Sequence, residues 1–340
     1  MAHVANITIQ SSKVDSDLTD YPIFVDLSDM NDEFWNTVSD GGSDIRIFKE
    51  DGETELAREI VACDTSAETG EVHFKYSGTL SSSSNTVIQI HADGSSSDYA
   101  SDSTYGSENV WSDYQAVYHM KESSGDMIDS AGNYDGSYEG SLPTNQTGKI
   151  GEAQYFDGND YASISDLGIS TDDISVTGWI YPDSSISENY HLFGNYEGGE
   201  WIDIKLYPNK DIAYSVDNDD DICSYKALGV ISEDAWNYLG LVYSTSEKKI
   251  YGYLDGSEEG TDTHTGDNPD LGTNSYHIGK SRDKNGEYLI GKTDELRIKK
   301  GVLSGDWIST EHNNQSSPST FYTASEPSPA TNTTNFFNFF

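Results

Sequence analysis

Short segments in which apolar and polar residues alternate follow one another along nearly the whole chain, separated by clusters of Gly, Asp, Asn and Ser. Successive side chains of a strand point to opposite faces, so a period of two predicts half-buried strands, and many such segments are typical of antiparallel sandwiches or barrels. A first set of predicted strands lies at 5–9, 21–27, 45–47, 72–76 and 87–90, and a second set at 115–120, 153–156, 174–180, 202–206, 212–216, 236–243, 250–254, 276–278 and 296–298. The chain is therefore predicted to be all-β, with two antiparallel β-sandwiches and one or two short helices.

Breaks in this pattern divide the chain. The stretch 95–109 is rich in Ser, Asp, Gly and Tyr, which suits a connection between an N-terminal sandwich at 1–108 and a larger sandwich at 109–315. A short helix near 29–39 should pack on the first sandwich, because acidic residues fill its first turn and two glycines end it.

The last predicted segment, 316–340, is a tail rich in Ser, Pro, Thr and Asn that should not fold alone. It ends in an aromatic cluster made of Phe336, Phe337, Phe339 and Phe340. We interpret this cluster as an anchor for a groove of an assembly partner; the alternative is an apolar frayed end.

Charge restricts the partners. The chain has 19 Lys and Arg against 59 Asp and Glu, a formal net charge of −40. This balance repels phosphate backbones and anionic lipid headgroups, so nucleic-acid and membrane-surface binding are excluded, and no segment approaches the ~18 apolar residues of a membrane-spanning helix. Such acidity fits a halophilic or marine protein, or a calcium-rich extracellular setting, and does not choose between them. The two cysteines, Cys63 and Cys223, are expected to be free buried thiols.

Several strings in the second unit, in a consistent order, indicate a known fold. They are VWSDYQAVYHM at 110–120, GKIGEAQYFDGNDY at 148–161, VTGWIYP at 176–182, IYGYLDG at 250–256, HIGK at 277–280 and GKTDELRI at 291–298. Together they resemble the laminin-G-like, concanavalin A-like lectin/glucanase jelly roll over about 111–315. The string FWNTVSDGGSDIR at 34–46 resembles an uncharacterised β-sandwich domain that often precedes such a domain.

The resemblance admits both glycan binders and glycoside hydrolases. Retaining glucanases of this fold carry Glu-x-Asp-x-x-Glu on one strand, which sets nucleophile and acid about 5 Å apart, and this chain has no such string. The nearest pair, Glu200 and Asp203, is spaced by three, so its carboxylates should point to opposite faces of a strand. We therefore predict no enzymatic activity and no catalytic residues.

A structural calcium ion is the predicted cofactor. Calcium takes six to eight oxygen ligands, and the acidic loops of the second unit offer them. Many laminin-G-like domains hold calcium, and the resemblance implies Asp157, Asp160 and Asp294 as ligands, with Asp129 as a fourth. The alternative is chance clustering of carboxylates in a very acidic chain.

Sugar binding needs aromatic rings beside polar groups, because a pyranose presents an apolar face and a rim of hydroxyls. The aromatic residues that lie close together on predicted loops and strand ends are Tyr190, Tyr196, Trp201 and Tyr207. They are the predicted glycan-binding residues.

These observations leave three function classes. A surface-type, lectin-like double sandwich without a visible export signal predicts a non-enzymatic virion component, such as a capsid decoration, turret, spike or tail fibre, assembled in the host cytoplasm. Its predicted partners are a glycan on the host surface and other virion proteins or a second copy of itself, as a homo-oligomer. The alternatives are an exported cell-surface adhesin or S-layer-associated protein whose signal has been removed, and a glycoside hydrolase.

Overall fold

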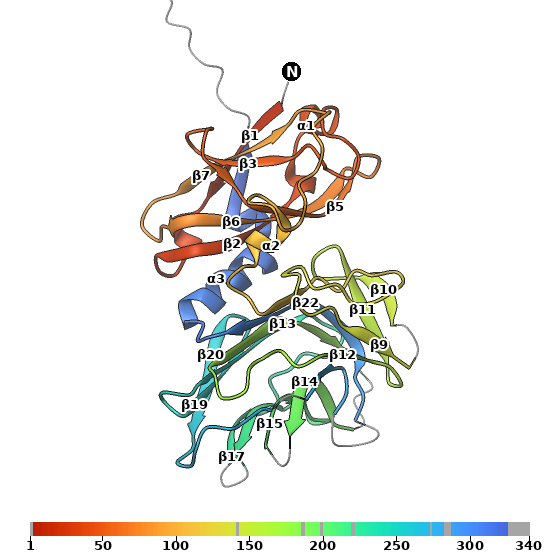
Figure 1. The fold of residues 1–340 in the computed structure, drawn as a ribbon, viewed down its shortest axis with the longest axis vertical. Helices are drawn as coiled ribbons and strands as arrows, with labels where there is room; N and C mark the ends of the chain where they lie inside the picture. Colours follow the sequence, from red (N-terminus) through yellow and green to blue (C-terminus); the bar gives the residue numbers. More distant parts are fainter. Residues whose placement is uncertain are drawn as a thin grey trace, which may run out of the picture.

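The computed structural model of the chain describes residues 3–140, 143–184, 188–197, 200–218, 222–272, 274–281 and 287–325. These residues form two β units that lie end to end, an N-terminal unit in red to orange and a C-terminal unit in yellow to blue (Figure 1). The sheets are antiparallel and the helices are short, so the predicted all-β class is confirmed.

The N-terminal unit is a sandwich of two sheets around one apolar core. Its alternating strands bury every second residue, as β1 shows with Ala5, Ile7 and Ile9 inside. One sheet has the order β23 (Tyr322–Ser325), β1 (His3–Ile9), β7 (Thr86–Ala92), β3 (Arg46–Lys49) and β4 (Glu55–Leu56). The other has the order β2 (Leu18–Asp26), β6 (Thr69–Leu80) and β5 (Arg58–Asp64).

Strand β23 shows what holds the first ten residues of the predicted tail, 316–325. Helix α4 (Pro318–Phe321) and β23 return to the N-terminal unit, where β23 pairs with the edge of β1 from Asn6↔Ser325 to Ile9↔Tyr322. Phe321 and Tyr322 are buried in the N-terminal core, which explains why this polar segment folds: it does so on another part of the chain. The predicted aromatic anchor at 336–340 lies outside the described residues.

The helix predicted near 29–39 is present only as a single turn. A 3₁₀ turn, η2 (Leu27–Asp29), precedes α1 (Asp32–Trp35), which begins where the Asn31 side chain accepts a hydrogen bond from the Phe34 N–H. The other short helices of this half are η1 (Ser11–Lys13) and α2 (Ser107–Val110). Within the described residues, no helix is long and apolar enough to cross a membrane.

The C-terminal unit is a larger sandwich whose core lies between two curved sheets. The eight-stranded sheet has the order β10 (Thr144–Thr147), β11 (Glu152–Asp157), β22 (Ile290–Lys300), β13 (Ile174–Pro182), β18 (Asn237–Ser244), β19 (Lys249–Leu254) and β20 (Ser257–Thr263), with β8 (Ala116–Tyr118) also paired to β22. The seven-stranded sheet has the order β17 (Ile222–Ala227), β16 (Ile212–Asn218), β15 (Glu200–Leu206), β14 (Tyr190–Glu197), β21 (Tyr276–Ile278), β12 (Tyr161–Ile164) and β9 (Ser137–Glu139).

The two sheets have different surroundings. The eight-stranded sheet faces the N-terminal unit, and helix α3 (Gly305–Ser316) lies between them (Figure 1). Ile308 of α3 packs with Trp179 and Tyr238 on the outer side of this sheet, while Asn314 exchanges two hydrogen bonds, of 2.8 and 2.9 Å, with the backbone of Phe24 in β2. Strands β14, β15 and β17 of the other sheet lie at the end away from the N-terminal unit (Figure 1).

Candidate functional site

Strand β15 divides its residues between the core and the outer face of the seven-stranded sheet. Ile202, Ile204 and Leu206 are buried in the core. Because side chains alternate along a strand, the intervening residues point to the outer face. They are Trp201, Asp203, Lys205 and, directly after the strand, Tyr207.

A charged cluster, made of His191, Asp203, Lys205 and Glu287, occupies this outer face. The register of β14 and β15 places His191 opposite Lys205. His191 Nδ1 lies 3.3 Å from Asp203 Oδ2, and His191 Nε2 lies 2.7 Å from Glu287 Oε2. Lys205 Nζ lies 3.3 Å from the same Glu287 oxygen. We call this group the outer-face cluster; its side chains are 9–16% exposed, and their mutual contacts hold the charged donors and acceptors in position.

Aromatic rings lie beside the outer-face cluster. The Tyr207 ring has Lys226 Nζ 4.1 Å and Lys205 Nζ 5.5 Å from its centre. Burial, followed by the Asp203 charge, raises the pKa of Tyr207, so its hydroxyl stays a hydrogen-bond donor at neutral pH. Trp201 lies two residues from Asp203 on the same face, about 7 Å along the strand.

A second aromatic group lies on the same sheet toward its other edge. Tyr161 of β12 packs against His277 of β21, with ring centres 4.9 Å apart, and Lys280 Nζ lies 4.3 Å from the Tyr161 ring centre. Strand β21 pairs with β14, and β12 pairs with the other edge of β21. The outer face therefore presents rings on both sides of a polar centre.

The structure separates the four predicted glycan-binding residues. Trp201 and Tyr207 lie on the outer face. Tyr190 does not, because its register partner is the core residue Leu206, so its ring is fully buried. The Tyr196 side chain lies outside the described residues. The sequence did not point to His191 or Glu287. Lys205 could have been found, because the aromatic or charged residues at 201, 203, 205 and 207 alternate onto one face of a strand.

The predicted calcium ligands do not form one site. Asp129 uses both carboxylate oxygens to organise its own loop: Oδ1 accepts from the N–H groups of Val117 and Ala131, and Oδ2 from those of Asn133 and Tyr134, all at 2.8–3.0 Å. Four N–H donors occupy its lone pairs, so Asp129 does not fit a metal-ligand role.

Asp294 also lies apart from the other two candidates. Asp157 pairs with Ile290 across β11 and β22, and Asp294 follows four residues later, about 13 Å along the strand. The Asp160 Oδ1 accepts a 3.0 Å hydrogen bond from the Asp157 N–H, which closes the β11–β12 turn. As the structure places them, the predicted aspartates therefore do not form one calcium site. Calcium binding itself stays a prediction.

The carboxylate pair considered for hydrolysis is also separated. In β15, Glu200 lies two and four residues before the core residues Ile202 and Ile204, on the same side of the strand. Asp203 points to the outer face. Glu200 Oε2 instead accepts a hydrogen bond from the Asp270 backbone N–H. This pair lacks the shared face that retaining hydrolysis requires.

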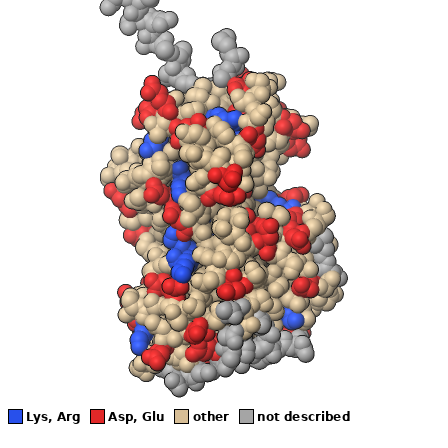
Figure 2. Space-filling model, viewed as in Figure 1, with Lys and Arg blue, Asp and Glu red and all other residues tan. Residues whose placement is uncertain are grey.

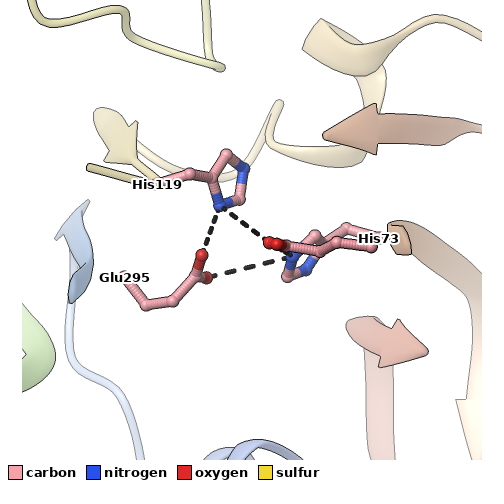
Figure 3. A group of neighbouring side chains, drawn as sticks. His73, His119 and Glu295 are labelled. Atoms are coloured by element: carbon pink, nitrogen blue, oxygen red, sulfur yellow. Dashed lines mark hydrogen bonds and ion pairs between the residues drawn. The ribbon is translucent and has the colours of Figure 1, made fainter. Parts of the chain in front are cut away.

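A second polar group, which we call the interface cluster, lies buried between the two units and consists of Glu71, His73, His119 and Glu295 (Figure 3). Burial would lower the pKa of His119, but the charges of Glu295 and Glu59 outweigh it and raise that pKa to about 10. Burial lowers the pKa of His73 to about 3. The surrounding carboxylates therefore favour positive charge at His119, and burial favours the neutral form of His73.

Comparisons with known proteins bear on the fold. Residues 156–309 match the family described as the concanavalin A-like lectin/glucanases superfamily, so the resemblance found in the sequence is confirmed and this segment is a concanavalin A-like domain. No curated protein matches the chain.

Three solved structures to which the chain is similar all have TM-scores below 0.5. Domain 4 of AbnA, an extracellular GH43 arabinanase from Geobacillus stearothermophilus, solved in complex with arabinotriose, has a TM-score of 0.49 and 20% identity, over 59% of this chain and 98% of that domain. The receptor-binding domain of botulinum neurotoxin D has a TM-score of 0.47 and 12% identity, over 60% and 53% of the two chains. The binding domain of Paraclostridial Mosquitocidal Protein 1 has a TM-score of 0.47 and 11% identity, over 59% and 52%. This chain thus spans about half the length of these two toxin domains.

Proposed function

We propose that the chain is a non-catalytic adhesion protein that binds glycans on the outer face of its seven-stranded sheet, and that it is displayed on the surface of a virion. The concanavalin A-like domain supports the lectin-like class. The observation that carries the proposal is the outer-face cluster, in which Asp203, His191, Glu287 and Lys205 contact one another beside the Tyr207 ring.

This arrangement suits a sugar chemically. A pyranose ring has an apolar face that packs on an aromatic ring, and hydroxyls that both donate and accept hydrogen bonds. The carboxylates of Asp203 and Glu287 accept from hydroxyls, and Lys205 and Lys226 donate to them. Because a strongly acidic chain repels anions, we expect neutral or cationic sugars rather than sulfated or sialylated ones.

The position of this face supports a role in attachment. It lies at the end of the molecule away from the N-terminal unit (Figure 1). The last described strand, β23, belongs to the N-terminal unit, so both ends of the described chain lie there and the lectin-like domain projects from it. Many copies on one particle would strengthen weak glycan binding through avidity, by up to ~10²–10⁴-fold.

A glycan array with the labelled full chain tests the proposal. We expect wild type to bind a subset of glycans and Tyr207→Ala to lose at least about tenfold in affinity, equivalent to ~1.4 kcal/mol. Tyr76→Ala is the matched control, because Tyr76 also has a lysine over its ring, Lys49 at 5.4 Å, but lies in the N-terminal unit. Absence of glycan binding by the wild type, or equal loss in both variants, would overturn the proposed face.

Two further measurements separate the alternatives. Mass spectrometry of purified particles and of cell envelopes from the same culture locates the chain; recovery from envelopes alone would favour a cell-surface adhesin over a virion protein. Release of reducing ends from a bound polysaccharide would make the chain a glycoside hydrolase.

A further inference from the structure

The interface cluster is assembled from strands of both units. Glu71 and His73 lie on β6 of the N-terminal unit, His119 follows β8, and Glu295 lies on β22 of the C-terminal unit. The exposed fractions of the four side chains are 7% or less. Figure 3 shows His73, His119 and Glu295 pointing toward a common centre.

Four distances between facing nitrogen and oxygen atoms of the cluster bracket the ligand separation around a tetrahedral ion. Glu71 Oε1 lies 2.9 Å from His73 Nε2 and 3.8 Å from His119 Nδ1. Glu295 contributes Oε1 at 2.6 Å from His119 Nδ1 and Oε2 at 3.9 Å from His73 Nε2. Four ligands bonded at 2.0–2.1 Å around a tetrahedral ion are separated by about 3.3 Å, the middle of this range.

A strained backbone brings Glu295 into this position. The β13–β22 register shifts between Thr177 and Trp179, which marks a bulge, and Glu295 there has φ +51°, a conformation unusual for a residue other than Gly or Asn. Glu295 lies on the side of the N-terminal unit, opposite to its neighbour Leu296, which is in the core. Strain of this kind persists where the surroundings over-determine it, and functional sites are its usual location.

Neighbouring side chains contact three of the four residues from outside the cluster. His119 Nε2 lies 3.1 Å from Glu59 Oε2, a carboxylate that also accepts from Trp111 Nε1 at 2.5 Å and Ser130 Oγ at 2.7 Å. A carboxylate behind a histidine is the common outer shell of a metal-bound imidazole. Arg297 donates to Glu295 Oε2 at 2.8 Å, and Lys121 pairs with Glu71 Oε2.

We propose that Glu71, His73, His119 and Glu295 bind one divalent d-block ion of the zinc class between the two units. Two imidazole nitrogens and two carboxylate oxygens suit zinc and its neighbours rather than calcium, which prefers six to eight oxygens. This site shares no residue with the predicted aspartate set, although Asp294 directly precedes Glu295. It is independent of the glycan-binding proposal, since it lies at the other sheet.

Solvent reaches the cluster from two sides. A cleft of about 730 Å³ between the units is lined by Glu71 and Lys121, together with Lys149 and Gln315. A second hollow of about 290 Å³ is lined by Glu59, His119, Lys121 and Ser130. A hydrated ion therefore has an entry path to the buried ligands, as a metal site requires.

The ion would fix the two units to each other. Because two ligands come from each unit, binding requires the units to be docked, and the binding free energy adds to the stability of the docked arrangement. The full chain should then melt at a higher temperature with zinc than after chelation.

Cobalt spectroscopy on the full chain tests the site without mutagenesis. The protein, without a histidine tag and dialysed against EDTA, is titrated with Co²⁺ in millimolar Ca²⁺ and Mg²⁺, which saturate surface carboxylates. We expect one equivalent of Co²⁺ to give intense visible bands of four-coordinate cobalt, displaced by one equivalent of Zn²⁺. The spectrum of hydrated Co²⁺ at every ratio would overturn the proposal.

Variants then assign the ligands. His73→Gln and His119→Gln should lose the cobalt bands, and Glu59→Gln should weaken Co²⁺ binding about 10–100-fold with all four ligands intact. His91→Gln is the matched control, because His91 lies on β7 and contacts Gln89 rather than the cluster. Bands that survive in His73→Gln and His119→Gln, or that disappear in His91→Gln, would place the ion elsewhere and refute the site.

Discussion

At the scale of single residues, the junction between the units is held by buried charges rather than by apolar contact alone. Arg297 is 2% exposed, lies over the Trp111 ring at 4.8 Å, and contacts Glu295 at 2.8 Å and Glu311 at 3.5 Å. Glu311 of α3 also accepts hydrogen bonds from Tyr238 at 2.6 Å and Thr177 at 2.8 Å. A charge buried in this way is tolerated only with its partners in place.

Removing Glu311 should therefore be costly. Glu311→Ala leaves Arg297 with one carboxylate fewer and two hydroxyls without their acceptor, and we expect a loss of ~3–5 kcal/mol in the free energy of unfolding, measured in urea. Lys300→Ala is the control, because Lys300 pairs with Asp172 where both side chains are at least 40% exposed, and its loss should be under ~1 kcal/mol. Equal, small losses would show that the buried pair contributes little.

Asp160 should give the stability of the chain a pH dependence. Burial raises its pKa to about 6 in the folded state, above its ordinary value of 3.8, so folding favours the neutral carboxyl. This contribution to stability is present below pH 4 and is lost as the pH rises through 6. Asp160→Asn should therefore gain stability relative to wild type between pH 4 and pH 7, measured by urea unfolding at both values; parallel profiles would contradict the shift.

The sequence could supply some residues of the candidate site but not their arrangement. Trp201, Asp203 and Tyr207 are separated by even numbers of residues along one strand and its end. Their shared face therefore follows from the alternation of side chains. Glu287 joins them from 82 residues beyond Lys205, and Tyr190 turns inward through its pairing with Leu206. Such facts depend on strand register, which local pattern does not specify.

At the scale of elements, a segment distant in sequence completes the N-terminal sandwich. Strand β23 covers the edge of β1, which would otherwise expose unpaired backbone groups. The Tyr322 hydroxyl accepts a 2.9 Å hydrogen bond from the Asp26 N–H and donates to Asp29 Oδ2 at 2.9 Å. The C-terminal segment is therefore a structural part of the N-terminal unit.

Truncating the buried ring of this segment should destabilise the N-terminal unit. Phe321 is fully buried in that core, so Phe321→Ala should cost ~3–5 kcal/mol by lost burial and the cavity left behind. Thr323→Ala, on an exposed position of β23, should change stability by less than ~0.5 kcal/mol. Hydrogen exchange of β1 amides reports the same effect locally; protection unchanged in Phe321→Ala would show that β23 is dispensable.

Element types were predictable where alternation was strong, and element partners were not. The period-two segments at 5–9 and 202–206 became β1 and β15 because each has a clear apolar face. The tail at 316–325 lacks that pattern, and its fold depends on Phe321 and Tyr322 reaching a core built some 300 residues earlier. The bulge at Glu295 likewise arises from pairing with β13, not from any local signal.

At the scale of the whole molecule, the negative charge is spread over both units. Figure 2 shows Asp and Glu over the visible face of each unit, with fewer Lys and Arg. A formal charge of −40 destabilises a compact state through self-repulsion, which salt screens over about 10 Å at 0.1 M and 3 Å at 1 M.

Salt should therefore stabilise the chain. We expect the midpoint of thermal unfolding to rise steadily from 0.05 to 1 M NaCl, because the folded chain concentrates its charge more than the unfolded one. Glycerol at matched viscosity is the control. A flat or falling midpoint would show that the carboxylates are already neutralised, by bound cations or by pairing, and would weigh against the halophilic or marine prediction.

The central claim is that glycans bind to the outer face of the seven-stranded sheet, and calorimetric titration tests it most directly. The oligosaccharide with the strongest array signal is titrated into wild type, Asp203→Ala, Tyr207→Ala and the control Tyr76→Ala. We predict one site per chain in wild type and Tyr76→Ala, and affinity at least about tenfold weaker in Asp203→Ala and Tyr207→Ala, since each removes a contact of the proposed face. Wild-type affinity in both outer-face variants would contradict the claim.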